Sequence, residues 1–194
     1  MGASNEELEQ QLVTIASESP WFMQALLAVR KLQLSSWCIG AGAVRNLVWD
    51  ALHQVASPSA LSDVDVAYYD ATNLTAEHDA QLQQALASYL PSVPWEVTNQ
   101  AGVHQWFEAF FGHAVEPLRS LEEAVASWPE YATSVGISIQ PNGSLQVTAP
   151  HGLQDLFALV VRRNPTRVSV ETYRQRVAQK RYAERWPKVK VMPC

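Results

Sequence analysis

Three acidic residues, Asp63, Asp65 and Glu96, have the types and spacing of a metal-binding site. Asp63 and Asp65 lie two positions apart in "SDVDVAYY", which has the β-branched and aromatic character of a strand. Residues two apart on a strand point to the same face, where two carboxylates repel each other unless a cation lies between them. Hard divalent cations such as Mg²⁺ or Mn²⁺ prefer oxygen ligands. The pair predicts a divalent-metal site, and Glu96 in "VPWEVTN" is the expected third carboxylate.

A glycine-containing turn precedes these acids and could bind phosphate. The apolar run "SSWCIGAG" ends at Gly40 and Gly42, and "AVRNLVWDALHQ" resumes with apolar residues at helical spacing. The N-terminus of a helix carries free N–H donors and partial positive charge. Backbone groups at Gly40, Gly42 and Ala43 are therefore candidates for nucleotide binding, and the side chains of Arg45 and Asn46 in the first turn could assist.

The positions of these residues follow from the elements around them. Strands are expected over 35–42, 62–69 and 93–99, and "TSVGISIQPNGSLQVTAP" predicts a hairpin that turns at Asn142-Gly143. Apolar periodicity and capping residues predict helices over 5–17, 20–34, 43–54, 76–90, 103–111, 120–128, 152–163 and 169–186. Three further polar residues lie near strand ends or helix starts, where they could contact a substrate: Asn99, Gln100 and His104.

The order of these elements predicts an α/β fold with a mixed, twisted sheet of roughly five strands and helices packed on it. The 194 residues are expected to form one domain, 1–194, with a core over about 20–161 and a basic helical extension over about 162–194. The acids should lie at one end of the sheet. The large apolar residues expected in the core are Trp106, Phe107, Phe110, Leu156 and Leu159.

The charge of −5 is unevenly distributed along the chain. From Arg162 onward there are ten basic and two acidic residues, against four basic and seventeen acidic residues before it. This asymmetry indicates that the basic segment packs on the acidic body, binds a polyanion, or is a solvated helix. No apolar stretch reaches the roughly 18 residues of a membrane helix, and the polar start lacks the features of a signal peptide, so we expect a cytoplasmic protein without a membrane partner.

Four stretches together carry a resemblance to a known superfamily: "GAGAVRNLVWD", "SDVDVAYYD", "WEVTNQAGVH" and "APHGLQDLF". A glycine turn, an Asp-x-Asp strand and a third acid on a later strand resemble the nucleotidyltransferase superfamily typified by DNA polymerase beta. The wording around Gly42 to Leu47 is similar to the signature of the tRNA CCA-adding branch. From about Ser36 to Pro187 the chain resembles a bacterial nucleotidyltransferase-like family.

The resemblance implies a metal-dependent reaction in which an acceptor hydroxyl attacks the α-phosphorus of a nucleoside triphosphate and pyrophosphate leaves. Asp63 and Asp65 would hold the metal ions, with Glu96 completing the site. The implied partners are a nucleoside triphosphate and an acceptor that the sequence does not identify: a small molecule, a nucleic acid or a protein.

The chain also departs from the CCA-adding pattern, and two other interpretations stay open. Ala41 stands where that branch has a glycine, Asn46 replaces an aspartate, and the chain contains no Glu-Asp pair. One alternative is a catalytically degenerate module that binds a nucleotide or nucleic acid. The other is a Rossmann-type NAD(P)-binding oxidoreductase, since Gly40-x-Gly42 with Asp70 is part of a dinucleotide fingerprint, although Arg45 occupies the third glycine position.

Overall fold

A computed structural model describes residues 3–194. In it, the strand expected over 35–42 forms the centre of a five-stranded sheet. The order is β3-β2-β1-β4-β5. The strands are β1 Trp37–Gly40, β2 Val64–Tyr68, β3 Trp95–Asn99, β4 Gly136–Ile139 and β5 Leu145–Thr148, with a separate pair β6 Val160–Val161 and β7 Lys190–Val191. β2 and β3 run parallel, whereas β1 is antiparallel to β2 and β4. The predicted α/β fold with a mixed sheet is confirmed.

This topology contradicts the Rossmann interpretation. A dinucleotide-binding fold needs a parallel pair of strands joined by a right-handed crossover helix at the glycine turn. Here the helix after that turn joins β1 to β2, and these two strands are antiparallel. The glycine turn therefore belongs to a different architecture.

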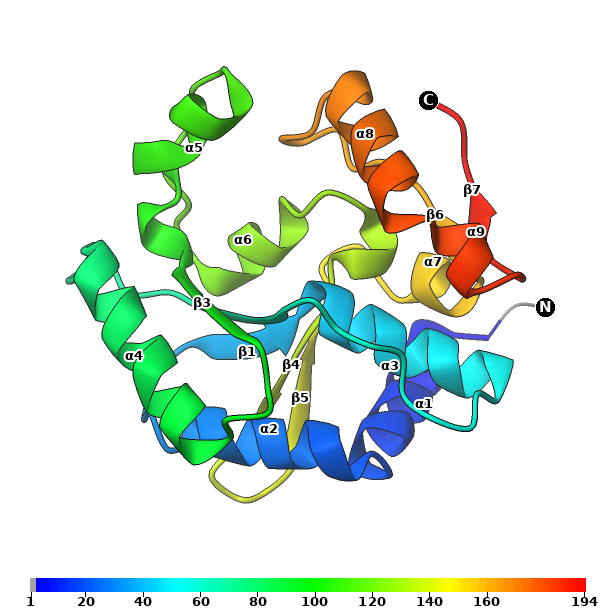
Figure 1. Ribbon diagram of the computed structural model, residues 1–194, viewed down its shortest axis with the longest axis horizontal. Helices are drawn as coiled ribbons and strands as arrows, with labels where there is room; N and C mark the ends of the chain where they lie inside the picture. The colour runs from blue at the N-terminus through cyan, green and yellow to red at the C-terminus, as the bar shows by residue number, and fades with distance from the viewer. Residues whose placement is uncertain (1–2) are drawn as a thin grey trace.

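The helices surround the sheet, with α1 to α3 and α4 packed on it and α5, α6 and α8 on the opposite side in Figure 1. Their bounds are α1 Asn5–Ser17, α2 Pro20–Arg30, α3 Ala41–His53, α4 Ala76–Tyr89, α5 His104–Phe111, α6 Leu121–Ala126, α7 Gln154–Phe157, α8 Val170–Lys180 and α9 Tyr182–Arg185, and the short 3₁₀ turns are η1 Gln100–Gly102 and η2 Tyr131–Thr133. The predicted hairpin and most of the predicted helices are confirmed.

Alternation along the strands divides the apolar residues between two clusters. Ile39, Val64 and Val66 enter the main core with residues of α1, α2 and α3. Cys38 and Ala67, which point to the other face, pack with α6 in a smaller cluster. Asp65 has the same parity as Ala67, so β2 directs it away from the main core.

The C-terminal region differs from the two long helices expected over 152–163 and 169–186. The first is only one turn, α7, because Leu159 adopts a left-handed backbone (φ 58°) and the chain continues as β6. The second breaks at Arg181 (φ 50°) into α8 and α9. β7 then pairs in parallel with β6, and Trp186 is fully buried. The basic segment therefore packs on the body, as one of the interpretations of its charge predicted.

Two of the residues expected in the core are exposed. Phe107 and Leu156 are buried and Leu159 packs at the edge of the core, but Trp106 is 40% exposed and Phe110 is 77% exposed. Both belong to α5, a helix of eight residues that buries only Phe107. The helical spacing of the aromatic residues predicted the helix correctly, but α5 carries more apolar residues than one buried face can hold.

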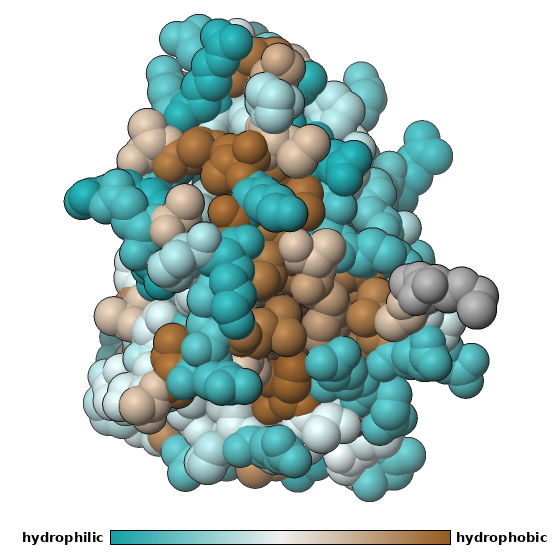
Figure 2. Space-filling model, turned by 90° about the vertical axis from the view of Figure 1, so that its right-hand side faces the viewer, coloured by the Kyte–Doolittle hydropathy of each residue, from teal (hydrophilic) through white to brown (hydrophobic). Residues whose placement is uncertain are grey.

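Apolar side chains also reach the surface near the C-terminal elements. Figure 2 shows a band of hydrophobic residues, flanked by hydrophilic ones, on the face at the right-hand side of Figure 1. Within residues 3–194, no single helix has the length and apolar character needed to cross a membrane. The helices α1 and α2 meet those criteria jointly, but they are bent by 91° relative to each other.

Candidate functional site

Asp65 and Glu96 lie side by side on the two parallel strands. The register of β2 and β3 pairs Asp65 with Glu96, and strands in a sheet are about 4.8 Å apart, so the two side chains share a face. Asp63 lies one residue before β2 rather than within it, and Ser62 Oγ donates a hydrogen bond of 2.9 Å to its carboxylate. The sheet thus brings the predicted second and third acids together, with the first at the start of the strand.

The ionisation of Asp65 depends on the two neighbouring acids. Burial, together with the negative charges of Asp63 and Glu96, raises the pKa of the Asp65 carboxyl to about 7. Lys180 and Arg176 of α8 oppose this rise. The charges of the basic C-terminal segment therefore lie close enough to the acids to affect their ionisation.

The glycine turn is held against the sheet by a tryptophan. A side chain at Gly40 would place its Cβ 2.5 Å from the Trp128 ring and 2.9 Å from the Val135 carbonyl oxygen, so only glycine fits. Ala41 donates a backbone hydrogen bond to Val135 and adopts φ 49°, the left-handed region that favours glycine. Ala41, which stands where the CCA-adding branch has a glycine, therefore adopts a backbone conformation that is typical of glycine.

The first turn of α3 presents backbone N–H groups without a side-chain cap. Gly40 is the N-cap, and Gly42 and Ala43 follow in the first turn. These donors occupy the end of the helix where an anion is stabilised. The predicted role of this turn in binding phosphate is compatible with its geometry.

The side chains of Arg45 and Asn46 are buried within the protein. Arg45 is 4% exposed, and its guanidinium lies 5.1 to 5.6 Å from the ring centres of three aromatic residues, namely Trp49, Tyr182 and Trp186. Its Nε and Nη2 atoms donate to Asn46 Oδ1 at 3.2 and 2.7 Å. This cation–π environment attaches α3 to α9. The geometry favours a structural role for both side chains over direct contact with a phosphate.

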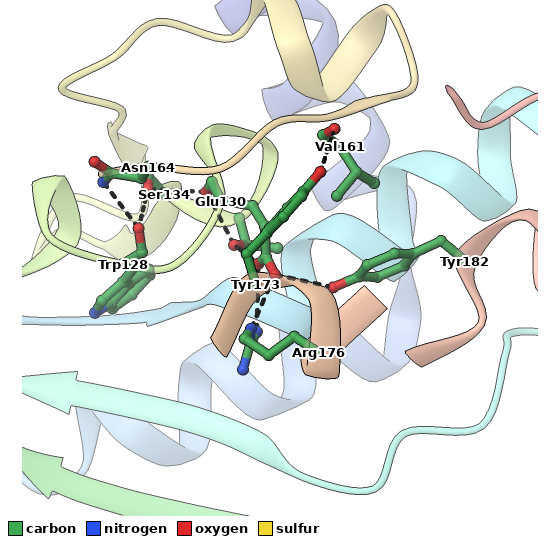
Figure 3. Close-up of polar contacts among 9 residues, drawn as sticks. Trp128, Glu130, Ser134, Val161, Asn164, Tyr173, Arg176 and Tyr182 are labelled. Carbon is green, nitrogen blue, oxygen red and sulfur yellow. Dashed lines mark hydrogen bonds and ion pairs between the residues drawn. The ribbon is translucent and has the colours of Figure 1, made fainter. Parts of the chain in front are cut away.

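A buried charged network attaches α8 to the segment behind the site (Figure 3). Glu130, which is 1% exposed, accepts hydrogen bonds from Arg176 Nε at 2.9 Å, Thr133 Oγ1 at 2.8 Å and Tyr182 Oη at 3.3 Å. Burial alone would raise the pKa of Glu130, but the Arg176 guanidinium, the hydrogen bonds from Arg176 and Thr133 and the charge of Arg45 hold it below its ordinary value. The carboxylate is therefore charged and fixes Arg176 in place.

Asn164 completes this arrangement by holding Trp128. Its Nδ2 donates to the carbonyl oxygens of Ala126 and Trp128 at 2.6 and 2.8 Å, and its Oδ1 accepts from Thr166. The Trp128 ring packs on Gly40, so Trp128 connects Asn164 of the C-terminal segment with the glycine turn.

The three residues predicted to contact substrate have different environments. Asn99 uses its full hydrogen-bonding capacity on backbone groups of Asp70, Asn73 and Ala101, so it fixes a loop. His104 begins α5, and its Nδ1 is buried without a hydrogen-bond partner among the described residues. Gln100 is 9% exposed and donates weakly to the Thr98 carbonyl at 3.4 Å. Of the three, Gln100 is the one that lines the site.

Two of the three acids, the turn and the basic helix α8 line one cavity of about 190 Å³, and Asp63 is not among its lining residues. Its lining includes Ala41 from the turn, Asp65 from β2, Glu96 from β3 and Arg176 from α8. Thr98, Gln100, Trp128 and Pro129 also line it. This cavity joins the two halves of the predicted site.

The donor chemistry of the acids fits a divalent metal, although their side chains are not closed around one position. Within residues 3–194, no group of three His, Cys, Asp or Glu side chains is gathered as a metal site requires. The carboxylates of Asp63, Asp65 and Glu96 are nonetheless oxygen donors whose mutual repulsion a divalent cation would relieve. A rearrangement of these side chains would accompany binding.

Three residues of the site were not predicted individually. Arg176 was only one of ten basic residues in the C-terminal segment, Glu130 lies between predicted elements, and Trp128 was expected only at the end of a helix. No local pattern distinguishes them, because their partners are distant in the sequence. The sequence feature that could have drawn attention to this segment is the tryptophan and the glutamate on either side of Pro129.

Comparisons with known proteins agree with this geometry. A family model described as nucleotidyltransferase matches residues 27–191. A solved structure described as a CCA-adding enzyme head domain is 27% identical, with a TM-score of 0.81 over 95% of this chain and 96% of that one. Among curated proteins, none matches this chain.

Longer structures share the fold at lower identity. A complex of a CCA-adding enzyme with CTP is 10% identical, with a TM-score of 0.55 over 95% of this chain, and a tRNA-processing enzyme complex is 17% identical, with a TM-score of 0.50 over 87%. The chain spans 43% of each of these two. The match over residues 27–191, with the acids and the turn in one cavity, shows that this chain belongs to the nucleotidyltransferase family.

Proposed function

We propose that this nucleotidyltransferase transfers a nucleoside monophosphate from a nucleoside triphosphate to a hydroxyl acceptor in a reaction that depends on Mg²⁺ or Mn²⁺. The observation that carries the proposal is the single cavity lined by Ala41, Asp65 and Glu96. A phosphate-binding turn and a carboxylate pair that line one cavity are what nucleotidyl transfer requires.

The groups of this chain have distinct roles in the proposed reaction. Backbone N–H groups of Gly42 and Ala43 bind the terminal phosphates, which orients the α-phosphorus toward the acids. Asp65, Glu96 and Asp63 would hold the metal, which when bound would supply positive charge to the phosphates and lower the pKa of the acceptor hydroxyl. Arg176, fixed by Glu130 and lining the same cavity, stabilises negative charge on the phosphates.

The bonds and protons of the transfer are balanced without a further reactant. The acceptor oxygen forms a bond to the α-phosphorus as the bond from that phosphorus to the bridging oxygen breaks. The electron pair of the broken bond leaves with pyrophosphate. The acceptor proton passes to Glu96, which is exposed and therefore able to release it to water.

Calorimetry with each of the four ribonucleoside triphosphates, in Mg²⁺ or in EDTA, tests the proposal. At least one triphosphate should bind in Mg²⁺, and removal of Mg²⁺ or the substitution Asp65→Asn should weaken binding at least tenfold. Glu77→Gln, on the exposed surface of α4, is the matched control and should bind as the wild type does. A wild-type protein that binds no triphosphate in Mg²⁺ would exclude the proposed reaction.

One observation favours a second candidate, a nucleotide-binding module without turnover. The acids are not gathered as a metal site requires within residues 3–194, which is what a degenerate site would show. Triphosphate binding of equal strength in Mg²⁺ and EDTA, unchanged by Asp65→Asn, would support this candidate over the enzyme.

A further inference from the structure

A second cavity, of about 230 Å³, adjoins the proposed catalytic cavity. The two cavities share the residues Thr98, Gln100, Trp128, Pro129 and Arg176. The second one extends between α5 and the C-terminal segment, and Figure 1 shows α5 and α8 on opposite sides of this region. A ligand bound in the second cavity would therefore lie directly beside the reacting groups.

The stereochemistry of the proposed reaction determines what lies on this side. In an in-line displacement the attacking oxygen approaches the phosphorus opposite the leaving group. The leaving pyrophosphate lies at the glycine turn, and Ala41 of that turn lines the first cavity but not the second. Thr98 and Gln100, which the two cavities share, follow Glu96 along the chain. This is the side from which an acceptor attacks.

The walls of the second cavity favour a flat aromatic ring. Trp106, Phe107 and Phe111 line one side, with 6.3 Å between the ring centres of the stacked pair Trp106 and Phe107 and 4.5 Å between those of Phe107 and Phe111. Trp106 and Phe111 are 40% and 48% exposed although they are large and apolar. Aromatic rings that are open to a cavity bind planar ligands by stacking.

The cavity also contains a cation suited to an anionic group. The Arg167 guanidinium lies 5.6 Å from the centre of the Phe107 ring, and Nη2 donates to the Glu116 carbonyl at 2.5 Å, which fixes its position. Within residues 3–194 Arg167 forms no ion pair, whereas Arg176, which lines both cavities, is paired with Glu130. The charge of Arg167 is therefore available to a ligand in the second cavity.

We propose that the second cavity binds the acceptor, and that the acceptor is a small molecule with a planar aromatic ring, one anionic group and a hydroxyl. This inference rests on the proposed function, which supplies the direction of attack. The cavity volume suits one ring system rather than a folded partner.

Three related probes separate the requirements for the ring and the anion: adenosine 5′-monophosphate, adenosine and ribose 5-phosphate. Calorimetry is performed on the full chain in Mg²⁺ with saturating α,β-methylene ATP, which fills the triphosphate end of the site. Adenosine 5′-monophosphate should bind about tenfold more tightly than either fragment. If adenosine 5′-monophosphate binds no more tightly than adenosine or ribose 5-phosphate, the inference is overturned.

Matched substitutions on α5 and beside it locate the bound probe. Arg167→Gln should weaken adenosine 5′-monophosphate about tenfold and leave adenosine unchanged, with Arg167→Lys retaining most of the affinity. Phe111→Ser should weaken both ligands. The controls are Arg174→Gln on exposed α8 and Phe110→Ser, whose ring is 77% exposed and outside the cavity, and both should bind as the wild type does. A thermal melt of each variant verifies folding.

The outcomes distinguish this inference from the proposed function. If the ATP analogue binds but Arg167→Gln changes no probe, the acceptor assignment fails and the proposed function stands. If Arg167→Gln weakens the ATP analogue as much as adenosine 5′-monophosphate, the cavity holds the nucleoside of the triphosphate, which overturns the assignment. If the analogue fails to bind the wild type in Mg²⁺, the proposed function and the acceptor assignment fail together.

Discussion

At the scale of single residues, Ala41 carries backbone strain at the glycine turn. An L-residue in the left-handed region costs about 1 kcal/mol relative to glycine, while glycine loses about 0.4 to 1 kcal/mol through the greater entropy of the unfolded chain. These contributions nearly cancel, so Ala41→Gly should change the free energy of unfolding by less than about 1 kcal/mol. Urea unfolding measures this difference.

The neighbouring alanine provides the control for that substitution. Ala43 is fully buried in the first turn of α3, so Ala43→Gly loses both packing and helix propensity. It should lower the free energy of unfolding by about 1 to 2 kcal/mol. Equal losses at the two positions would show that Ala41 is not strained.

The ionisation of Asp65 makes the stability of the metal-free protein depend on pH. Its pKa is raised from 3.8 to about 7, so the folded state binds the proton more tightly than the unfolded chain does. The resulting stability is fully present below about pH 4 and is lost as pH rises through 7. The free energy of unfolding of Asp65→Asn should therefore equal that of the wild type at pH 4 and exceed it by about 2 kcal/mol at pH 8. This is about half of what the full pKa shift would give, because solvent screens the charges.

Unfolding in urea at pH 4, 6 and 8, with EDTA present, measures this effect. Glu77→Gln serves as the control on an exposed helix face and should show no pH-dependent difference. If the difference in free energy of unfolding between Asp65→Asn and the wild type does not grow with pH, the raised pKa of Asp65 is contradicted.

At the scale of elements, the junction of β1 and α3 depends on the contact between Gly40 and Trp128. Gly40→Ala would push its Cβ against the Trp128 ring and the Val135 carbonyl oxygen, and should lower the free energy of unfolding by about 2 kcal/mol or more. Because Trp128 lines both cavities, the affinity for Mg²⁺–triphosphate should fall as well.

Gly42→Ala is the matched control two residues away. The nearest atom to its added Cβ is Arg45 Nη2 at 3.6 Å, an ordinary contact, and the position is helical. This substitution should be neutral or stabilise by up to about 1 kcal/mol. Thermal melts of both variants check the pair, and equal effects would contradict the packing of Trp128 on Gly40.

The same elements show how far sequence reasoning could reach. Strands β1, β2 and β3 and the hairpin follow from short apolar patterns. The pairing of Asp65 with Glu96 needs in addition the register of β2 and β3, which parallel orientation alone does not fix. The exposure of Trp106 and Phe110 could not be predicted, because periodicity identifies an apolar face and not what covers it. The β6–β7 pairing joins residues about thirty positions apart, and no local pattern specifies such a contact.

At the scale of the whole molecule, the C-terminal segment is part of the folded core. Trp186 is fully buried and donates to Asp50 at 2.8 Å, Tyr182 is 1% exposed, and Arg176 pairs with buried Glu130. Truncation after residue 165 would remove these side chains and leave Glu130 charged without its partner, a loss of about 3 kcal/mol from this pair alone. The shortened chain should lose cooperative unfolding and bind an apolar dye.

Removal of Pro193 and Cys194 is the corresponding control. Both residues are exposed, and the Met192 carbonyl that accepts from Tyr173 Oη is retained. This shorter truncation should melt within about 2 °C of the full chain, since it removes no buried contact. A chain ending at residue 165 that still unfolds cooperatively would show that the C-terminal segment is a separate extension.

The central claim is a metal–triphosphate site built by Asp65 and Glu96 in one cavity with the glycine turn. It is tested most directly by electron paramagnetic resonance of Mn²⁺ titrated with protein and ATP. The wild type should bind Mn²⁺ when ATP is present, Asp65→Asn and Glu96→Gln should each lower that affinity at least tenfold, and Glu77→Gln should not. Mn²⁺ binding that is unchanged by Asp65→Asn and Glu96→Gln would contradict the account.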